Sequence, residues 1–194
     1  MKKKPTKKKI VVVKPKYKNT IVVNLLAGPG AGKSTMAASL FSKLKWKGVD
    51  CELAAEYAKD LVWEKRDKTF ENQVYIFGKQ HHRIFRLLGQ VEVVITDSPI
   101  LLTPIYDSQK RDSLKKLVFE ESNKCNNINV LVVRRKDYNP NGRIHTKSQA
   151  AGVDKTVHDF LVENKMPFEC IEGTEEGSLY LRDLVLEKLH ESKD

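Results

Sequence analysis

The stretch NTIVVNLLAGPGAGKSTMAASLFSKL, residues 19–44, determines how the rest of the chain is interpreted. An uncharged, mostly apolar run leads directly into AGPGAGKST, where three glycines and a proline precede a lysine, a serine and a threonine. A simple turn needs only one or two such residues. Apolar residues then recur at Met36, Leu40 and Leu44, the spacing of one face of a helix. The stretch therefore predicts a buried strand, a glycine-rich loop and a helix in immediate succession.

The loop follows the phosphate-binding pattern G-x-x-x-x-G-K-[S/T], with Ala27 in the first position, where glycine is more common. Glycines permit backbone conformations that are closed to other residues, so that successive N–H groups can point at phosphate oxygens. We expect Lys33 to reach the β- and γ-phosphates and the Ser34 hydroxyl to bind Mg²⁺. The positive end of the following helix adds to the attraction. The predicted cofactors are ATP and Mg²⁺, and the nucleotide-binding residues of the loop are Gly28, Gly30, Ala31, Gly32, Lys33, Ser34 and Thr35.

Apolar, β-branched runs alternate with amphipathic segments along the rest of the chain. The predicted strands are residues 20–27, 49–54, 92–96, 128–133 and 168–171. The predicted helices are residues 33–47, 56–65, 71–89, 107–124, 147–165 and 175–190. Apolar strands separated by helices are typical of a parallel sheet covered on both faces, and right-handed crossovers then give three layers. We predict an α/β fold of the P-loop NTPase type, nucleotide-kinase-like, with a five-stranded parallel sheet in one domain over residues 19–194.

The positive charge of the chain is concentrated at one end. The chain has a formal net charge of +10, and residues 1–18 contain nine lysines and no acid. The remaining residues have 26 Lys and Arg against 25 Asp and Glu, so the predicted domain is nearly neutral. We interpret residues 1–18 as a lysine-rich tail, either a solvated arm or a loose contact for nucleic acid.

The overall composition is that of a globular protein outside the membrane, with 40% hydrophobic and 31% charged residues. No apolar run approaches the roughly 20 residues that cross a bilayer, and no signal-peptide pattern follows the basic start. The three cysteines are far apart and odd in number, which favours free thiols in a reducing compartment. We therefore expect a cytoplasmic protein with no membrane partner.

Asp97 directly follows the strand predicted over residues 92–96. In a parallel sheet of this type, the end of such a strand lies beside the phosphate loop. Asp97 is therefore our candidate for a second Mg²⁺ ligand, acting through water. The alternative is a capping role for the segment that begins at Ser98 and Pro99.

The polar segment RRKDYNPNGRIHTK, residues 134–147, follows the fourth predicted strand and contains Arg134, Arg135 and Arg143. Guanidinium groups stabilise the charge that builds on a transferred phosphoryl group, and a mobile loop can close over it and exclude water. Exclusion of water matters most to a kinase, because water would otherwise take the phosphate. We predict an arginine-rich lid here, with Arg134 and Arg143 acting on the phosphoryl group and Arg135 on the nucleotide. This favours a small kinase over a motor or switch, which usually needs more chain.

Residues 20 to about 190 resemble the P-loop kinases grouped with the ribosylnicotinamide-kinase domain of NadR-like proteins. They look particularly like small phage-encoded members, often labelled as AAA-type ATPases. The matching segments are AGPGAGKST at 27–35, AAEYAKDL at 54–61, VVITDSPILL at 93–102 and VRRKDYNPNGRIHTKSQAAGVD at 133–154. The last is the most diagnostic, because the lid of this family has a similar Arg, Tyr-Asn-Pro and Gly-Arg pattern. The resemblance implies an ATP-dependent kinase of a nucleoside, a nucleotide or a related ribosyl compound, in the host cytoplasm if phage-encoded.

The resemblance also implies residues for the phosphate acceptor. In related nucleoside kinases, an acid placed like Glu56 accepts the proton of the attacking hydroxyl, although Asp97 could also do this. Similar deoxynucleoside kinases hold the base with a glutamine and an arginine from the region of Gln80 and Arg83. These two residues are three positions apart and so share one face of a helix. Alternatively, this face is a basic surface exposed to solvent.

Two other functions stay open on the sequence. The first is a kinase that acts on DNA, such as on 5-hydroxymethyluracil in phage DNA or on a polynucleotide end, with the lysine-rich tail supplying backbone affinity. The second is a nucleotide-binding ATPase module that has no phosphate acceptor.

Overall fold

A five-stranded, all-parallel sheet forms the centre of the structure, a computed structural model that describes residues 15–135 and 146–192. The strands lie in the order β2-β3-β1-β4-β5. They are β1 (Tyr17–Leu26), β2 (Cys51–Ala54), β3 (Val93–Thr96), β4 (Cys125–Val133) and β5 (Glu169–Glu172). The predicted α/β class and the five-stranded parallel sheet are confirmed.

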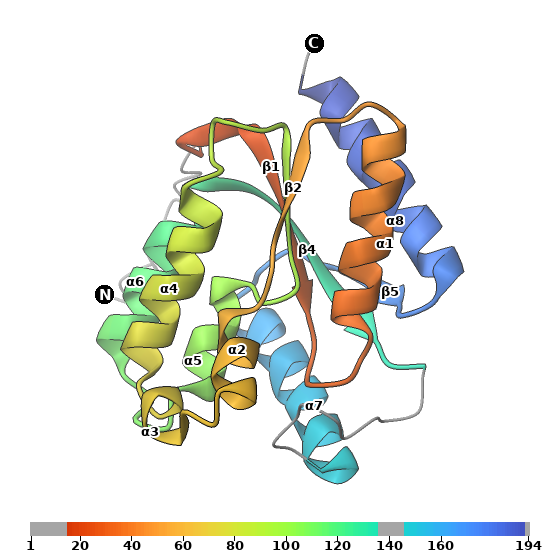
Figure 1. The fold of residues 1–194 in the computed structure, drawn as a ribbon. Helices are drawn as coiled ribbons and strands as arrows, with labels where there is room; N and C mark the ends of the chain where they lie inside the picture. The colour runs from red at the N-terminus through yellow and green to blue at the C-terminus, as the bar shows by residue number, and fades with distance from the viewer. Residues whose placement is uncertain (1–14, 136–145, 193–194) are drawn as a thin grey trace, which may run out of the picture.

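Helices cover both faces of the sheet (Figure 1). One face carries α1 (Lys33–Trp46) and α8 (Glu175–Glu191), and the other carries α4 (Gln73–Phe85), α6 (Asp112–Ser122) and α7 (Lys147–Glu163). Short helices gather toward the ends of the strands: α2 (Tyr57–Trp63), α3 (Asp67–Phe70), the 3₁₀ helix η1 (Ile100–Leu102) and α5 (Thr103–Tyr106). The fold therefore has three layers, as predicted.

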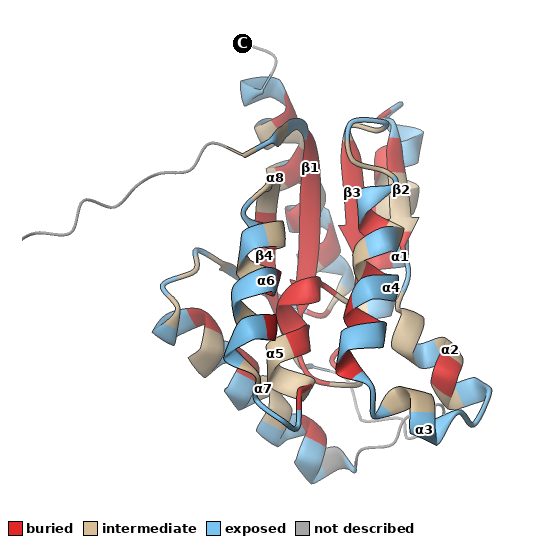
Figure 2. Ribbon diagram, turned by 90° about the vertical axis from the view of Figure 1, so that its left-hand side faces the viewer, coloured by how far each residue is buried: buried red, intermediate tan, exposed pale blue. Residues whose placement is uncertain are grey.

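The central strand β1 is buried on both sides, because its alternate residues enter two different cores. Val23 and Leu25 pack into the core beneath α1 and α8, whereas Val22 and Leu26 pack into the core beneath α4, α6 and α7. Figure 2 shows buried residues along the strands and exposed residues on the outer faces of the helices. This two-sided burial explains why the strand reads as a continuous apolar run.

An asparagine cluster within the sheet makes β4 longer than predicted. Asn24 Nδ2 of β1 donates to the side-chain oxygens of Asn127 (2.9 Å) and Asn129 (3.0 Å) of β4, and Asn129 in turn donates to the Pro167 carbonyl (3.0 Å). The strand begins at Cys125, whereas apolar periodicity predicted residue 128. Asparagine is depleted in strands, but here the side chains satisfy one another inside the sheet.

Other boundaries also differ from the predictions. β1 begins at Tyr17, inside the range assigned to the tail, where the Tyr17 N–H donates to the Lys124 carbonyl (2.9 Å). The helix predicted over residues 107–124 begins only at Asp112, and η1 and α5 precede it. The helix predicted over residues 71–89 runs from Gln73 to Phe85 and is preceded by α3. These short helices carry too few residues for their periodicity to be visible in the sequence.

Two predicted segments fall largely outside the described residues. They are residues 1–14 of the lysine-rich tail and residues 136–145 of the lid, which include Arg143. Within the described part of the chain, no helix has both the length and the apolar character that a bilayer crossing requires.

Candidate functional site

The carboxyl ends of four strands meet at one edge of the sheet, where open α/β sheets bind their ligands. β1 leads into the glycine-rich loop, β2 toward Glu56, β3 into Asp97 and β4 into Arg134. Thr96, the last residue of β3, pairs with Ala54, the last residue of β2, and with Asn24 of β1, which continues two residues further to Leu26. The topology therefore brings together predicted site residues that are distant in the sequence.

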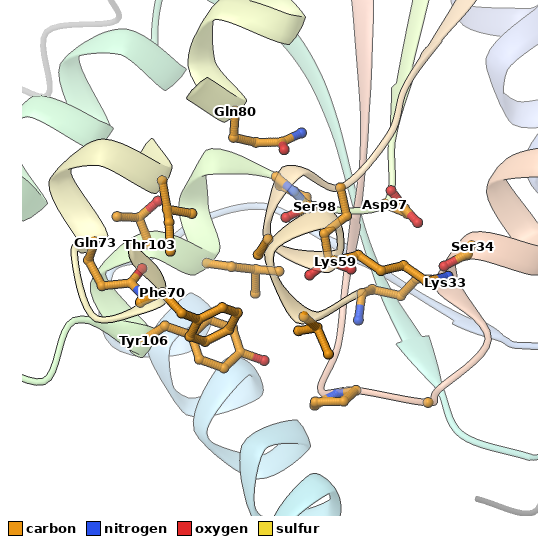
Figure 3. A pocket seen from close by; sticks show the side chains of 18 of the residues that line it. Lys33, Ser34, Lys59, Phe70, Gln73, Gln80, Asp97, Ser98, Thr103 and Tyr106 are labelled. Carbon is orange, nitrogen blue, oxygen red and sulfur yellow. The ribbon is translucent and has the colours of Figure 1, made fainter. Parts of the chain in front are cut away.

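A cavity of about 310 Å³ opens at this edge. At one end it is lined by the glycine-rich loop and the start of α1, and at the other by side chains of α3, α4 and α5 (Figure 3). Its size is at the lower end of the range for small-molecule sites. Its polar and aromatic lining residues are Lys33, Ser34, Thr35, Glu56, Lys59, Phe70, Gln73, Gln80, Asp97, Ser98, Thr103 and Tyr106.

The N-terminus of α1 is built differently from those of α4, α7 and α8. Its N-cap, Gly32, has no side chain to accept a hydrogen bond, and its first turn contains no acid. By contrast, Asn72, Thr146 and Thr174 cap α4, α7 and α8 with their side chains. The first N–H groups of a helix have no acceptor within the helix, so the start of α1 remains open to an anion.

The glycines of the loop serve two different purposes. Gly30 (φ 75°) and Gly32 (φ 101°) have the left-handed conformation that favours glycine, as predicted. Gly28 does not have a positive φ, and here the expectation is wrong. A Cβ at Gly28 would lie 2.5 Å from the Ala150 carbonyl and 2.9 Å from Asp154 Oδ1, both on α7. Gly28 is therefore required for the close approach of α7 to the loop.

Lys33 spans the loop. Its Nζ donates to the carbonyl oxygens of Ala27 and Gly28, at 2.9 Å each. Burial lowers the pKa of Lys33, although the nearby carboxylates of Glu56, Asp97 and Asp154 oppose this shift. The side chain is thus a partly buried cation with acids nearby, at the position where the loop pattern expects phosphate.

Asp97 is almost fully buried, and its Oδ1 has no hydrogen-bond partner among the described residues. Figure 3 shows it on the same side of the cavity as Ser34 and Lys33. The capping alternative is not realised, because η1 has Pro99 as its N-cap and no side-chain cap. A buried carboxylate oxygen without a donor is costly unless a cation binds there.

The donor set around Asp97 fits Mg²⁺. This ion prefers oxygen ligands and is usually held by one or two carboxylates together with water and substrate phosphates. Ser34 and Asp97 offer a hydroxyl and a carboxylate in one cavity. Within the described ranges, no group of three or more His, Cys, Asp and Glu could hold a metal by itself. The protein thus fits a metal whose coordination is completed by a ligand.

The two described lid arginines bind carboxylates from different elements. Arg134 Nε and Nη2 each lie 2.9 Å from Asp154 Oδ2 of α7, and Nη2 also donates to the Pro29 carbonyl (2.9 Å). Arg135 pairs with Glu172, the last residue of β5. Neither arginine lines the cavity. Arg134 nevertheless contacts the glycine-rich loop directly, at Pro29.

Gln80 lines the cavity, but its amide is already engaged. Its Oε1 accepts from the Tyr57 N–H (2.9 Å), and its Nε2 lies 3.4 Å from both the Ala55 carbonyl and Thr96 Oγ1. Gln80 thereby ties the start of α2, where Glu56 is the N-cap residue, to the end of β3. Its contacts are those of a residue that positions Glu56.

Arg83 does not line the cavity. Its Nη1 donates to the Ala55 carbonyl (3.0 Å), its Nη2 donates to Asp60 Oδ2 (2.6 Å), and its guanidinium lies over the Tyr57 ring. Of the predicted acceptor residues, the structure therefore brings Glu56 and Gln80 to the cavity and leaves Arg83 outside it.

Several residues of the site were not predicted. The far end of the cavity is lined by Phe70, Gln73 and Tyr106, which Figure 3 shows close to one another. Burial and the nearby carboxylates of Glu56 and Asp154 raise the pKa of Tyr106, so its hydroxyl stays protonated. Gln73 was visible on a predicted helix, but nothing in the sequence placed Tyr106 at the cavity or Asp154 near the loop.

Comparisons with known proteins give only a distant structural likeness. No protein-family model matches the chain, and no curated protein matches it. Among solved structures, a deoxyadenosine kinase from M. mycoides, bound to the products dCMP and a flexible dCDP, is similar with a TM-score of 0.46 and 16% sequence identity. The match covers 88% of this chain and 99% of that chain. A likeness at this level carries no argument about activity, which therefore rests on the residues of the site.

Proposed function

We propose that the protein is a Mg²⁺-dependent kinase that transfers the γ-phosphate of ATP to a hydroxyl group of a nucleoside or a related ribosyl compound. The observation that carries this proposal is the continuity of one cavity. Its one end is the glycine-rich loop with Lys33, and its other end is a pocket with Phe70, Gln73 and Tyr106. Such a cavity can hold a phosphate donor and an acceptor at the same time.

The nucleotide end has the groups that phosphoryl transfer requires. The open N-terminus of α1 and the Lys33 ammonium group would bind the β- and γ-phosphates. Mg²⁺, held by Ser34 and Asp97, would neutralise charge on these phosphates. Arg134 and, in the undescribed part of the lid, Arg143 would stabilise the charge that develops on the transferred group.

Glu56 is the proposed general base. It lines the same cavity as Lys33 and Tyr106, and its charge acts to raise the pKa of both side chains. The acceptor oxygen would attack the γ-phosphorus while the bond to the β–γ bridging oxygen breaks and ADP leaves. The hydroxyl proton would pass to the Glu56 carboxylate. Asp97 is assigned to the metal because its free oxygen is buried beside the loop.

The far end of the cavity favours a neutral acceptor over one that already carries a phosphate. Its described lining contains no arginine, and Lys59 is its only cation besides Lys33. The aromatic rings of Phe70 and Tyr106 suit a planar ring, and the Gln73 amide can donate to or accept from the ring edge. A nucleoside meets these requirements. The presence of this pocket also favours a kinase over an ATPase that has no acceptor.

The test is to incubate the protein with γ-labelled ATP, Mg²⁺ and a panel of acceptors, and to follow the label by chromatography. The panel contains nucleosides, nucleoside monophosphates, nicotinamide riboside, and unmodified and hydroxymethylated DNA. We expect label on a nucleoside or ribosyl hydroxyl, and none in Lys33→Ala. Label released only as inorganic phosphate, independent of every acceptor, would contradict the proposal and favour the ATPase alternative.

The DNA alternative is tested by removing residues 1–14, which leaves β1 intact. Activity on a free nucleoside should be unchanged by this truncation. A DNA-directed kinase would instead lose activity and salt sensitivity, because the removed lysines would have supplied contacts to the phosphate backbone.

A further inference from the structure

A carboxylate of α7 joins two parts of the nucleotide site. Asp154 Oδ1 accepts a hydrogen bond from the Gly28 N–H (2.6 Å), and Asp154 Oδ2 accepts from Arg134 Nε (2.9 Å). Arg134 in turn donates a hydrogen bond to the carbonyl oxygen of Pro29, in the same loop as Gly28. One side chain thus binds the loop directly and also through the arginine.

This arrangement is more constrained than an ordinary surface ion pair. The side chains of Arg134 and Asp154 are only 18% and 27% exposed, whereas those of the pair Lys155–Asp159 on the same helix are 80% and 42% exposed. The contact also depends on Gly28, since any side chain there would collide with α7. Charge-assisted bonds that are shielded from water are stronger than exposed ones.

Arg134 uses Nε and Nη2 for its bonds to Asp154 and Pro29, so Nη1 takes part in neither bond. Arg134 Nη1 is buried and has no hydrogen-bond partner among the described residues. A buried donor without an acceptor needs an explanation, such as a ligand that supplies one. Beside a phosphate loop, the natural acceptor is a phosphate oxygen.

We propose that Asp154 is a positioning residue of the nucleotide site, which holds the Arg134 guanidinium against the loop so that its remaining N–H groups meet a phosphate oxygen of the bound triphosphate. The inference rests on the proposed function, because it assumes that the loop binds a nucleotide. It adds a coupling between α7, which follows the lid, and the loop. Asp154 itself does not touch the reacting atoms.

If Asp154 instead opposed nucleotide binding, its removal would have the opposite effect on affinity. A carboxylate near phosphates repels them, and one that pairs with Arg134 could compete with the nucleotide for this arginine. In that case, removing Asp154 would strengthen nucleotide binding. If Asp154 positions Arg134, removing it weakens binding, because the arginine is no longer held at the loop. The sign of the change separates the two roles.

The experiment is calorimetric titration of the full chain with a non-hydrolysable ATP analogue and Mg²⁺. We expect Asp154→Ala to weaken binding about tenfold, the value of one charge-assisted hydrogen bond. Asp154→Asn keeps an acceptor for Gly28 but loses the charge that holds Arg134, so its effect should be intermediate. Arg134→Ala should weaken binding at least as much, and the double variant Asp154→Ala/Arg134→Ala should bind like Arg134→Ala alone.

Matched controls distinguish positioning from general damage. Asp159→Ala removes an exposed ion pair from the same helix and should leave the affinity unchanged. The thermal midpoint of each nucleotide-free variant reports its folding; if Asp154→Ala does not fold, Asp154→Asn carries the test. In transfer assays the KM for ATP should rise in Asp154→Asn, with little change in the KM for the acceptor.

Two results would overturn the inference. Unchanged or tighter analogue binding in Asp154→Ala and Asp154→Asn would do so, and so would losses that multiply in the double variant. If either result is found while the unsubstituted protein still transfers phosphate, the proposed function is unaffected. If the protein binds the analogue but transfers phosphate to no acceptor, the proposed kinase activity is refuted. The role of Asp154 in nucleotide binding can still be measured in that case. A protein that binds no triphosphate would refute both.

Discussion

Lys33 Nζ and the carbonyl oxygen of Ala27 are 2.9 Å apart, so the lysine that ends the glycine-rich loop bonds to the residue that begins it. A second bond to the Gly28 carbonyl keeps the ammonium group at the centre of the loop. This partly buried cation is incompletely solvated, and the desolvation lowers its pKa. A phosphate group would supply the counter-charge that the surrounding protein only partly provides.

The first prediction concerns Lys33→Met. We expect affinity for a Mg²⁺-ATP analogue to fall on the order of 100-fold, because the main cation facing the phosphates is lost. The free energy of unfolding without nucleotide should fall by no more than about 1 kcal/mol, since removing a buried charge also removes its desolvation cost. Calorimetric titration and urea unfolding measure the two quantities. Unimpaired binding would exclude Lys33 from the phosphate site.

The second prediction concerns Asp97→Asn. The Mg²⁺ concentration at half-maximal activity should rise on the order of 10-fold, because a neutral amide is a weaker ligand than a carboxylate. Stability in the absence of Mg²⁺ should not fall, since the carboxylate oxygen Oδ1 makes no hydrogen bond that the amide would lose. The measurement is a Mg²⁺ titration of the initial rate at saturating ATP. An unchanged Mg²⁺ requirement would remove Asp97 from the metal site.

The third prediction concerns Glu56→Gln. If Glu56 accepts the proton of the acceptor, kcat should fall on the order of 100-fold or more, while the KM values for ATP and acceptor change little. The substitution preserves the size of the side chain and one acceptor oxygen but removes the base. Initial-rate kinetics with each substrate varied in turn separate these parameters. A rise in KM with kcat unchanged would indicate a binding role instead.

The fourth prediction compares two glutamines that line the same cavity. Gln80 is bonded to Tyr57, Ala55 and Thr96, so Gln80→Leu should reduce the free energy of unfolding by about 1–3 kcal/mol. Gln73 Nε2 makes only a long contact with the Phe70 carbonyl (3.4 Å). Gln73→Leu should therefore raise the KM for the acceptor with little loss of stability. Equal effects of the two substitutions on stability would contradict this division of roles.

The fifth prediction concerns pH and a site away from the cavity. The Asp107 carboxylate accepts hydrogen bonds from the Arg111 guanidinium (2.7 and 3.1 Å) and from the Arg111 backbone N–H (2.9 Å). These bonds, above all those from the Arg111 side chain, lower the pKa of Asp107 to about 2 from an ordinary 3.8. Its stabilisation is therefore complete above about pH 4 and is lost as the pH falls toward 2. Asp107→Asn should cost on the order of 1–2 kcal/mol at pH 7 and much less at pH 2. Urea unfolding at both values checks this, and an equal loss at both would exclude the ionised pair as the cause.

Much of the nucleotide end could be predicted from the sequence because its signals are local. The buried strand, the loop of residues 27–32 and the start of α1 are contiguous, and each is specified by residues only a few positions apart. The placement of Asp97 followed from the general rule that parallel strands end at one edge. The five strands were found for the same reason, since apolar periodicity depends only on neighbouring residues.

The acceptor end and the ties between elements required the tertiary structure. Gln80 was expected to hold a substrate, but the approach of α4 to the start of α2 engages its amide within the protein. Tyr106 reaches the cavity from a helix of four residues, which is too short to leave a periodic pattern. Such positions depend on how crossover helices pack.

By itself, the sequence determined a strand, a glycine-rich loop and a helix, because neighbouring residues restrict the backbone that joins them. The tertiary structure alone decided that Asp154 meets Gly28, 126 positions away. It also decided that Gly28 serves close packing, whereas its neighbours Gly30 and Gly32 serve a left-handed backbone. The physical reason is that such a long-range contact depends on how whole helices pack against the sheet. No short segment of the chain specifies this packing.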